Sequence, residues 1–225
     1  MPILRKNGSK IYFVHTPKTA GSSLYLWVME NGWQISNLGT PKGPLNFTGV
    51  GKKIRENYGI FHLQQEGDYS QVKTSPQHVT ADIWTTWGPF DKSFAIVREP
   101  IERFQSALTF QYTSALRQQN RQHSTGLLES FRDAVLTRLE EREEAASALF
   151  DNHFCPQKSF VTVETQFFFF HGNWKTGIAD FLGLRGAIGH EKKAPMKIEL
   201  NARELAFAQA HYAEDIEWFT SLQSA

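Results

Sequence analysis

The sequence predicts an α/β domain with a central, mostly parallel β-sheet, because short apolar runs alternate with longer segments of helical periodicity. Two of the runs, at residues 11–14 and 91–97, are each followed by a polar turn and then by a helical segment. Strands of a parallel sheet are buried on both faces, which accounts for the nearly continuous hydrophobicity of both runs. Ligands of such sheets bind at the carboxyl ends of strands, where both polar turns fall. We therefore expect the functional site at these two turns.

The first run and the turn after it carry the strongest local signal. Residues 11–14 indicate a buried strand, and residues 24–29 indicate a helix that is hydrophobic nearly all round. The turn between them, residues 16–23 (TPKTAGSS), holds Lys18, one glycine and several hydroxyl groups, but no acidic residue. A helix N-terminus offers N–H groups without partners and the positive end of the helix dipole, and both favour an anion. This Lys18 loop therefore predicts a bound phosphate or sulfate.

The second run repeats the same architecture. It ends at Arg98, Glu99 and Pro100, and proline suits the first turn of a helix. Apolar residues then recur at helical spacing at positions 101, 104, 108 and 112.

The remaining elements follow from the same patterns. Residues 31–51 are rich in Gly, Pro and Asn and predict a long loop. Residues 77–84 predict a loop that feeds a short helix, with His78 near its start. Four consecutive phenylalanines, residues 167–170, predict core packing on both sheet faces. Further strands are expected at residues 58–63 and 160–163, and further helices at residues 127–150, 174–182 (ending at Gly183) and 201–222 (capped by Asn201).

Length and composition bound the class of protein. A chain of 225 residues fits one domain with a substantial core, so we expect a single domain over residues 1–225. The 24 Lys and Arg nearly balance the 23 Asp and Glu, so net charge gives no reason to expect nucleic-acid binding. The single cysteine, Cys155, excludes an internal disulfide and a zinc site built from cysteines. Because the sequence has neither a long apolar run nor a signal-peptide core, we expect a cytoplasmic protein without a transmembrane segment.

Two plainer interpretations of the Lys18 loop stand beside the anion site. It could be an ordinary turn between a strand and a helix, because short motifs recur by chance. It could also belong to a P-loop kinase or NTPase, which uses the same strand, loop and helix. However, the Walker A pattern GxxxxGK[ST] does not occur here, and Lys18 precedes Gly21 instead of following it.

Two motifs together resemble a known family. Residues 13–24 (FVHTPKTAGSSL) resemble the 5′-phosphosulfate loop of sulfotransferases that use 3′-phosphoadenosine 5′-phosphosulfate (PAPS), in the carbohydrate and heparan-sulfate 2-O-sulfotransferase-like group. Residues 96–107 (IVREPIERFQSA) resemble the 3′-phosphate motif of that family, in which a strand ends in arginine and the next helix bears a serine. The resemblance is tight over these motifs and loose but collinear across most of the chain. It implies a P-loop NTPase-like three-layer fold.

The resemblance also implies roles for individual residues in binding PAPS. Arg98 and Ser106 would converge on the 3′-phosphate through a charge-assisted and a neutral hydrogen bond, respectively. Lys192 and Lys193 lie in a basic loop, residues 189–195, of the sort that closes over the nucleotide in relatives. The loop that would hold the 5′-phosphosulfate comprises Pro17, Lys18, Thr19, Ala20, Gly21, Ser22 and Ser23.

Each of these assignments has a plainer alternative. Arg98 could pair with Glu99 or Glu102, and Ser106 could be a neutral helix residue. Arg103 could be a companion of Arg98 or a solvated or structural residue. The two lysines of the basic loop could be ordinary surface residues.

His78 is the first candidate for a catalytic base. It lies in the polar loop between the two motifs, where relatives often carry a catalytic histidine. Gln77 stands where many of those relatives have a glycine. Three nearby carboxylates remain alternatives for the base, although solvated surface is their more common location: Glu66, Asp68 and Asp82.

His153 is the second candidate. Residues 151–157 (DNHFCPQ) resemble an element that lines the acceptor side in family members. This makes His153 a second base or a contact to the acceptor. The plainer interpretation is a turn that ends a helix, which Pro156 alone would explain.

We therefore expect a PAPS-dependent sulfotransferase that acts on an acceptor hydroxyl, with a carbohydrate favoured by the resemblance. Lys18 would stabilise the charge that develops on the bridging oxygen of the leaving nucleotide, with Ser22 and Ser23 assisting. A sulfuryl group carries less negative charge than a phosphoryl group, so no metal ion is expected. The alternatives are a P-loop kinase or NTPase, which would bind ATP with Mg²⁺, and a noncatalytic nucleotide-binding protein, which would show no turnover.

Overall fold

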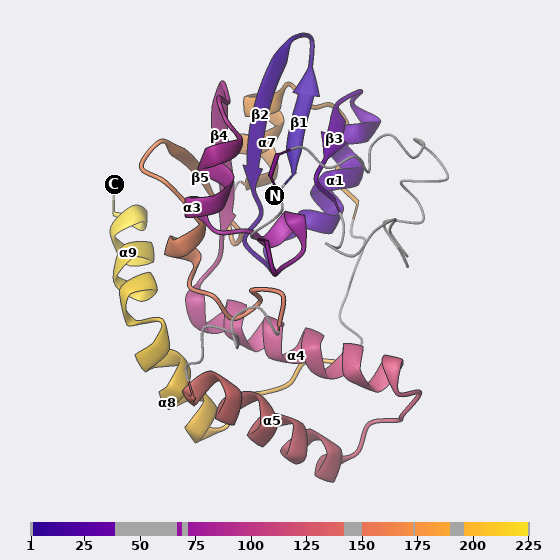
Figure 1. Ribbon diagram of the computed structural model, residues 1–225, viewed down its shortest axis with the longest axis vertical. Coiled ribbons are helices and arrows are strands. Elements are labelled where there is room, and N and C mark those ends of the chain that lie inside the picture. Colours follow the sequence, from indigo (N-terminus) through magenta and orange to yellow (C-terminus); the bar gives the residue numbers. More distant parts are fainter. Residues whose placement is uncertain are drawn as a thin grey trace. The chain divides into compact units, whose positions relative to one another are not determined.

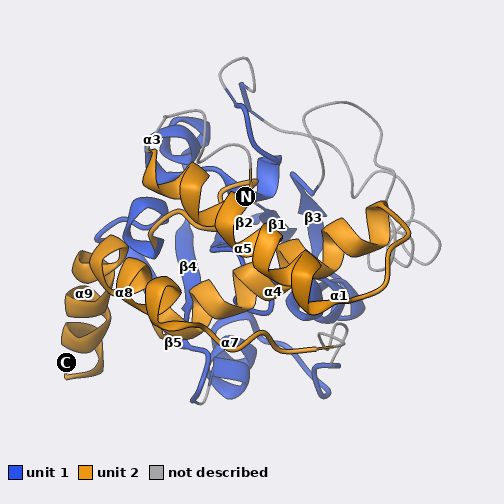
Figure 2. Ribbon diagram, turned by 90° about the horizontal axis from the view of Figure 1, so that it is seen from below, with its two compact units in different colours: residues 1–98, 157–192 blue, residues 99–156, 193–225 orange. Residues whose placement is uncertain are grey.

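The structure is a computed structural model that describes residues 2–38, 67–68, 72–141, 150–172, 174–189 and 196–224. The chain divides into two compact units (Figure 2). Residues 1–98 and 157–192 make up unit 1, and residues 99–156 and 193–225 make up unit 2. Each unit has a hydrophobic core of its own. The single domain over residues 1–225 stays a prediction.

Unit 1 is built on a sheet whose described strands follow the order β3-β1-β2-β4-β5 (Figure 1). β2 pairs in parallel with β4, and β4 with β5, whereas β1 is antiparallel to both β2 and β3. The mixed α/β class with a mostly parallel sheet is therefore confirmed. The strands are β1 (Ile3–Lys6), β2 (Ser9–Val14), β3 (Gln34–Ser36), β4 (Lys92–Val97) and β5 (Thr165–Phe169).

Helices pack on both faces of this sheet. Successive residues of β2 point to opposite faces, so Tyr12 and Phe13 contact different helices. Phe13 stacks on Phe94 with ring centroids 5.0 Å apart, in the core that α1 (Gly21–Glu30) and α7 (Trp174–Leu182) share. Tyr12 stacks on Trp84 of the short helix α3 (Ala81–Trp84) at 4.3 Å. The two predicted buried runs thus form the centre of unit 1.

β1 and β3 were not predicted from the sequence, and β3 lies within the long loop expected over residues 31–51. β1 and β2 form a hairpin whose two turn residues, Asn7 and Gly8, have positive φ angles of 50° and 84°. Such angles suit the two-residue turns that match the twist of a hairpin, and an Asn-Gly pair is a strong signal for them. β3 has only three residues and offers too short a pattern to be recognised.

The strand expected at residues 160–163 is wrong. Residues Gln157–Phe160 form the 3₁₀ helix η4, and Val163 is 95% exposed. The strand is β5, which contains three of the four consecutive phenylalanines and pairs with β4 so that Phe169 lies opposite Val97. In this register Phe168 contacts Phe94 of the core, with ring centroids 6.1 Å apart. The strand of the sheet that was expected at residues 160–163 is therefore formed by the segment that contains the phenylalanines.

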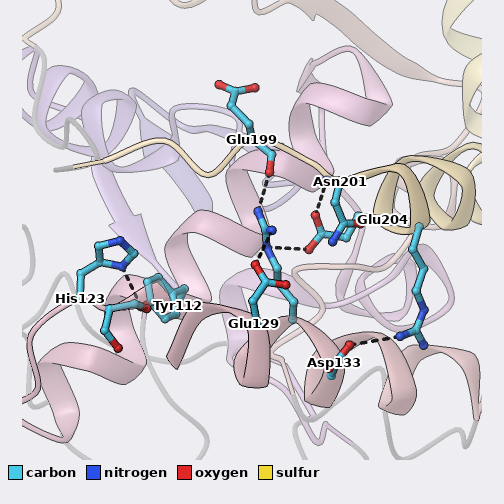
Figure 3. A network of polar contacts seen from close by, with 10 residues as sticks. Tyr112, His123, Glu129, Asp133, Glu199, Asn201 and Glu204 are labelled. Atoms are coloured by element: carbon cyan, nitrogen blue, oxygen red, sulfur yellow. Dashed lines mark hydrogen bonds and ion pairs between the residues drawn. The ribbon is translucent and has the colours of Figure 1, made fainter. Parts of the chain in front are cut away.

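Two predicted helix ends are confirmed. α7 is followed by Gly183, whose φ of 64° lies in the left-handed region that favours glycine after a helix. Asn201 caps α8 (Ala202–His211) by accepting a hydrogen bond from the Glu204 N–H at 2.9 Å. The Glu204 carboxylate accepts in return from the Asn201 N–H at 2.8 Å (Figure 3). This reciprocal pair is a capping box.

Unit 2 is helical in its described part, and its core joins α4, α5 and α8. The helix predicted to follow Pro100 is confirmed. The helix expected over residues 127–150 is described as far as α5 extends, and residues 142–149 lie outside the described residues. The bounds are α4 (Pro100–Gln118), α5 (Thr125–Glu140), α8 (Ala202–His211) and α9 (Ala213–Gln223).

The single helix expected over residues 201–222 is wrong, because α8 and α9 are separate and meet at Tyr212. Tyr212 is fully buried and donates its hydroxyl to the Phe154 carbonyl at 2.7 Å. Helical periodicity continues through the break and therefore did not reveal it. The strand expected at residues 58–63 and the loop beyond residue 38 lie outside the described residues.

Candidate functional site

The Lys18 loop follows β2 and opens onto α1. Lys18 and Ala20 have positive φ angles of 72° and 70°, which are uncommon for residues other than glycine. Such backbone conformations cost free energy and are typical of functional sites. They occur directly before the first turn of α1, whose N–H groups point out of the N-terminal end of the helix. A backbone of this kind ahead of a helix suits an anion.

Threonine side chains fix this loop to the sheet. Thr16 donates its hydroxyl to the Ile96 carbonyl of β4 at 3.0 Å, and Thr19 donates to the Thr16 carbonyl at 2.7 Å. Both threonines are fully buried. Ser22 and Ser23 are half-buried in the first turn of α1, so their hydroxyls stand closer to solvent than that of Thr19.

Gly21 is required by a neighbouring side chain. A Cβ atom at this position would lie 2.1 Å from Nε2 of His15. His15 is buried, and its Nδ1 lies 2.5 Å from the Tyr25 hydroxyl. The imidazole of His15 therefore leaves room only for a glycine at position 21.

Arg98 follows β4, and its backbone is held by a buried glutamine. Its N–H donates to Oε1 of Gln157 at 3.0 Å, and its carbonyl accepts from Nε2 of Gln157 at 2.7 Å. The guanidinium lies over the ring of Phe170, 4.6 Å from its centroid, and Nη1 donates to the Lys18 carbonyl at 3.4 Å. Unit 1 therefore brings a cation beside the Lys18 loop.

Glu99, one of the alternative partners of Arg98, caps α4 in unit 2. Its carboxylate accepts from the N–H of Ile101 at 3.0 Å and from the N–H of Glu102 at 2.6 Å. A carboxylate at a helix N-terminus is stabilised by these N–H groups and by the helix dipole.

His78 ends the 3₁₀ helix η2 (Pro76–His78) in unit 1 and is buried. Its ring Nδ1 lies 3.2 Å from the Ser75 hydroxyl, and its backbone N–H donates to the Ser75 carbonyl at 2.9 Å. The rings of His78 and His15 are in contact, with centroids 4.9 Å apart. Through His15, the first candidate base is linked to Gly21 of the Lys18 loop.

His153 belongs to unit 2 and is held on several sides. Its ring stacks on Phe110 with centroids 4.9 Å apart and planes 16° apart. Nδ1 lies 2.6 Å from the Phe150 carbonyl, which can only accept, so Nδ1 carries the proton. In the neutral ring Nε2 then holds the lone pair. The two preceding residues, Asp151 and Asn152, have positive φ angles of 53° and 58°.

Arg103 proves to be structural. It is fully buried in unit 2, where Nη1 donates to the carbonyl of His153 at 3.0 Å and Nη2 donates to that of Cys155 at 2.6 Å. Its guanidinium lies 5.2 Å from the ring centroid of Tyr212. Burial raises the pKa of the Tyr212 hydroxyl, which remains the donor to Phe154. Arg103 therefore holds the backbone on which His153 stands.

The other predicted residues have varied outcomes. Ser106 is half-buried on α4 of unit 2. Asp68 and Asp82 are exposed, as expected of solvated carboxylates. Three predicted residues lie outside the described residues: Glu66, Lys192 and Lys193.

Comparison with protein-family models assigns the chain. The model described as the sulfotransferase family matches residues 2–214, which spans both units. The chain belongs to the sulfotransferase family. Comparisons with curated proteins and with solved structures find no match. Membership of this family makes the protein a transferase of sulfuryl groups.

Unit 1 of this sulfotransferase brings several of the predicted residues together. Arg98 contacts the Lys18 loop directly, and His78 contacts it through His15. His15 was not predicted from the sequence, although a histidine directly after a buried strand and before a glycine-containing loop is a usable signal. Gln157 was expected near the acceptor, and its contacts with the Arg98 backbone were not predicted. No helix in the described part of the sulfotransferase is long and apolar enough to span a membrane.

Proposed function

We propose that the protein transfers a sulfuryl group from PAPS to a hydroxyl group of a carbohydrate acceptor. The observation that carries the proposal is the Lys18 loop, with left-handed backbone at Lys18 and Ala20 ahead of α1 and the Arg98 guanidinium beside it. PAPS presents two separate anionic groups, a 5′-phosphosulfate and a 3′-phosphate, which suit a loop and an arginine at neighbouring strand ends. The proposal includes a P-loop NTPase-like three-layer arrangement, in keeping with the helices on both faces of the sheet.

The chain's own groups fit this donor. The N–H groups at the start of α1, Lys18 and the hydroxyls of Ser22 and Ser23 would hold the 5′-phosphosulfate. Arg98 and Ser106 would hold the 3′-phosphate. Pro17, Thr19, Ala20 and Gly21 would shape the loop, and Lys192 and Lys193 would add contacts to the phosphates.

PAPS supplies an activated sulfuryl group. During transfer the acceptor oxygen forms a bond to sulfur, the bond from sulfur to the bridging oxygen breaks, and the acceptor proton passes to a histidine. His78 is the first candidate for this base. His153, whose Nδ1 is held by the Phe150 carbonyl at 2.6 Å, is the second. Lys18 would stabilise the negative charge on the bridging oxygen.

Positive charge and positioning are the main requirements of such an in-line displacement. A sulfuryl group carries less negative charge than a phosphoryl group, so the reaction does not demand a metal ion. The carbohydrate acceptor rests on the resemblance of the two motifs.

Calorimetric titration tests the donor site. We expect the protein to bind adenosine 3′,5′-bisphosphate, the product left by PAPS, more tightly than ATP with Mg²⁺. Loss of a charge-assisted hydrogen bond costs roughly 1.5–3 kcal/mol, so Lys18→Ala and Arg98→Ala should each weaken bisphosphate binding by roughly 10- to 150-fold.

Lys92→Ala is the matched control, because Lys92 is exposed and lies at the opposite end of the strand that precedes Arg98. It removes one positive charge and should leave the affinity nearly unchanged. Tighter binding of ATP than of the bisphosphate, or equal effects of all three substitutions, would overturn the proposal.

A further inference from the structure

Four side chains from three segments of unit 1 form a connected group beside the Lys18 loop. His15 follows β2, Tyr25 lies on α1, and Gln77 and His78 lie on η2. The Tyr25 hydroxyl lies 2.5 Å from Nδ1 of His15 and 3.4 Å from Oε1 of Gln77. The His15 ring in turn touches the ring of His78. His15, Tyr25 and His78 are all buried.

The two hydrogen bonds of the Tyr25 hydroxyl differ in length. Its single hydrogen can be donated either to Oε1 of Gln77, at 3.4 Å, or to Nδ1 of His15, at 2.5 Å. The shorter bond holds the imidazole of His15 by its Nδ1, whichever of the two atoms carries the proton. Gln77 lies at the far end of this chain of contacts.

His15 is in contact with both parts of the site that must be aligned. Its Nε2 is so close to Gly21 that the position has no room for a Cβ atom. Its other neighbour is the ring of His78, at 4.9 Å between centroids. The ring cannot turn without giving up the hydrogen bond to Tyr25, so its place between the loop and His78 is fixed.

We propose that His15, oriented by Tyr25 and Gln77, is a positioning residue that sets the location of His78 relative to the Lys18 loop. The inference rests on the proposed function, because it gives His15 a purpose only if His78 acts on an acceptor aligned with the bound donor. His15 would affect the reaction only through its contacts with His78 and Gly21. Misplacement of a reacting group by about 1 Å costs roughly 100-fold in rate, so small movements of His78 matter.

Removing one hydroxyl group tests this role. Tyr25→Phe keeps the aromatic ring and deletes the oxygen that is hydrogen-bonded to Nδ1 of His15. Its matched control is Tyr112→Phe in unit 2, where a buried tyrosine hydroxyl likewise lies 2.9 Å from Nδ1 of a histidine, His123 (Figure 3). We expect Tyr25→Phe to lower kcat by roughly 10- to 100-fold with an acceptor that the parent sulfates, and KM for PAPS to stay close to that of the parent. Tyr112→Phe should leave both unchanged.

Nuclear magnetic resonance of the histidine ring nitrogens provides a readout that needs no acceptor. A second variant, His15→Asn, keeps an N–H near the position of Nδ1 but removes the rest of the ring. Signals are assigned from their loss in His15→Asn and His78→Gln. We expect the ring signals of His78 to shift in both Tyr25→Phe and His15→Asn, and to stay in place in Tyr112→Phe.

The outcomes separate this inference from the proposed function. If the His78 signals are the same in the parent, Tyr25→Phe and His15→Asn, or if Tyr25→Phe turns over as fast as Tyr112→Phe, His15 does not position His78. If the parent fails to bind adenosine 3′,5′-bisphosphate, the proposed function fails, whatever the coupling between the two rings.

Discussion

Replacing Gly21 by alanine tests whether His15 packs against the Lys18 loop as tightly as the structure indicates. The added Cβ would lie 2.1 Å from Nε2 of His15 and 2.6 Å from two of its ring carbons. Atoms cannot remain at these distances, so either the ring or the start of α1 must move. The ring is buried and held through Nδ1 by Tyr25. Its movement therefore breaks that hydrogen bond.

The size of the effect follows from three contributions. Overpacking of a core typically costs about 1–3 kcal/mol, the lost hydrogen bond adds about 1 kcal/mol, and the higher helix propensity of alanine offsets about 1 kcal/mol. We expect Gly21→Ala to lower the free energy of unfolding by about 1–3 kcal/mol. Urea unfolding followed by tryptophan fluorescence measures this difference.

Two comparisons make the result specific. Gly126 lies in the first turn of α5, and a Cβ there would meet no atom within 4 Å. Gly126→Ala should therefore leave the stability unchanged or raise it by up to about 1 kcal/mol. In a His15→Ala background the clash is absent, so Gly21→Ala should cost much less there than in the parent. Equal stability of Gly21→Ala and Gly126→Ala, or an undiminished cost in the His15→Ala background, would refute the reasoning.

Three further predictions concern the surroundings of the site and the fold. Burial raises the pKa of Glu204 above its ordinary value of 4.5, so the folded state binds the carboxyl proton more tightly than the unfolded state. The contribution of this proton to the free energy of unfolding is therefore present below pH 4.5 and is lost as the pH rises through the folded pKa. Glu204→Gln should flatten this fall in urea unfolding measured over a pH series, and an unchanged slope would argue against the assignment. Gln157→Ala removes both hydrogen bonds to the Arg98 backbone, so it should destabilise the protein by about 1–3 kcal/mol and weaken bisphosphate binding. Stability and affinity equal to those of the parent would show that Gln157 does not hold Arg98. Val163→Asp should change the stability by less than about 0.5 kcal/mol, because the side chain is 95% exposed, and a loss of several times that size would favour the strand first expected at residues 160–163.

The strand, loop and helix units around Lys18 and Arg98 could be predicted because their signals are local. A buried run before a polar turn, followed by helical periodicity, is visible within about 20 residues of sequence. The same holds for the caps at Gly183 and Asn201, where the residue type itself satisfies the helix end.

Other features depend on partners far along the chain. Two apolar stretches, residues 160–163 and residues 165–169, could each have paired with β4. The sequence does not show that the second one, β5, forms the hydrogen bonds with that strand. The break between α8 and α9 falls at Tyr212, whose hydroxyl bonds to Phe154, 58 residues away in sequence. Periodicity contains neither kind of information.

The candidate site shows the same division. Lys18 and Arg98 could be recognised from charge at strand ends. The role of His15 could not, because it depends on contacts with Gly21, Tyr25 and His78 that only the folded unit brings about.

Transfer of radioactive sulfate from [³⁵S]PAPS to a panel of carbohydrates tests the central claim most directly. The parent protein should produce a labelled carbohydrate and adenosine 3′,5′-bisphosphate, Lys92→Ala should do so at the parent rate, and Lys18→Ala should lose most of the activity. If no carbohydrate is labelled while another class of hydroxyl acceptor is, the acceptor assignment is wrong. If Lys18→Ala labels carbohydrate as fast as the parent, the Lys18 loop is not the donor site.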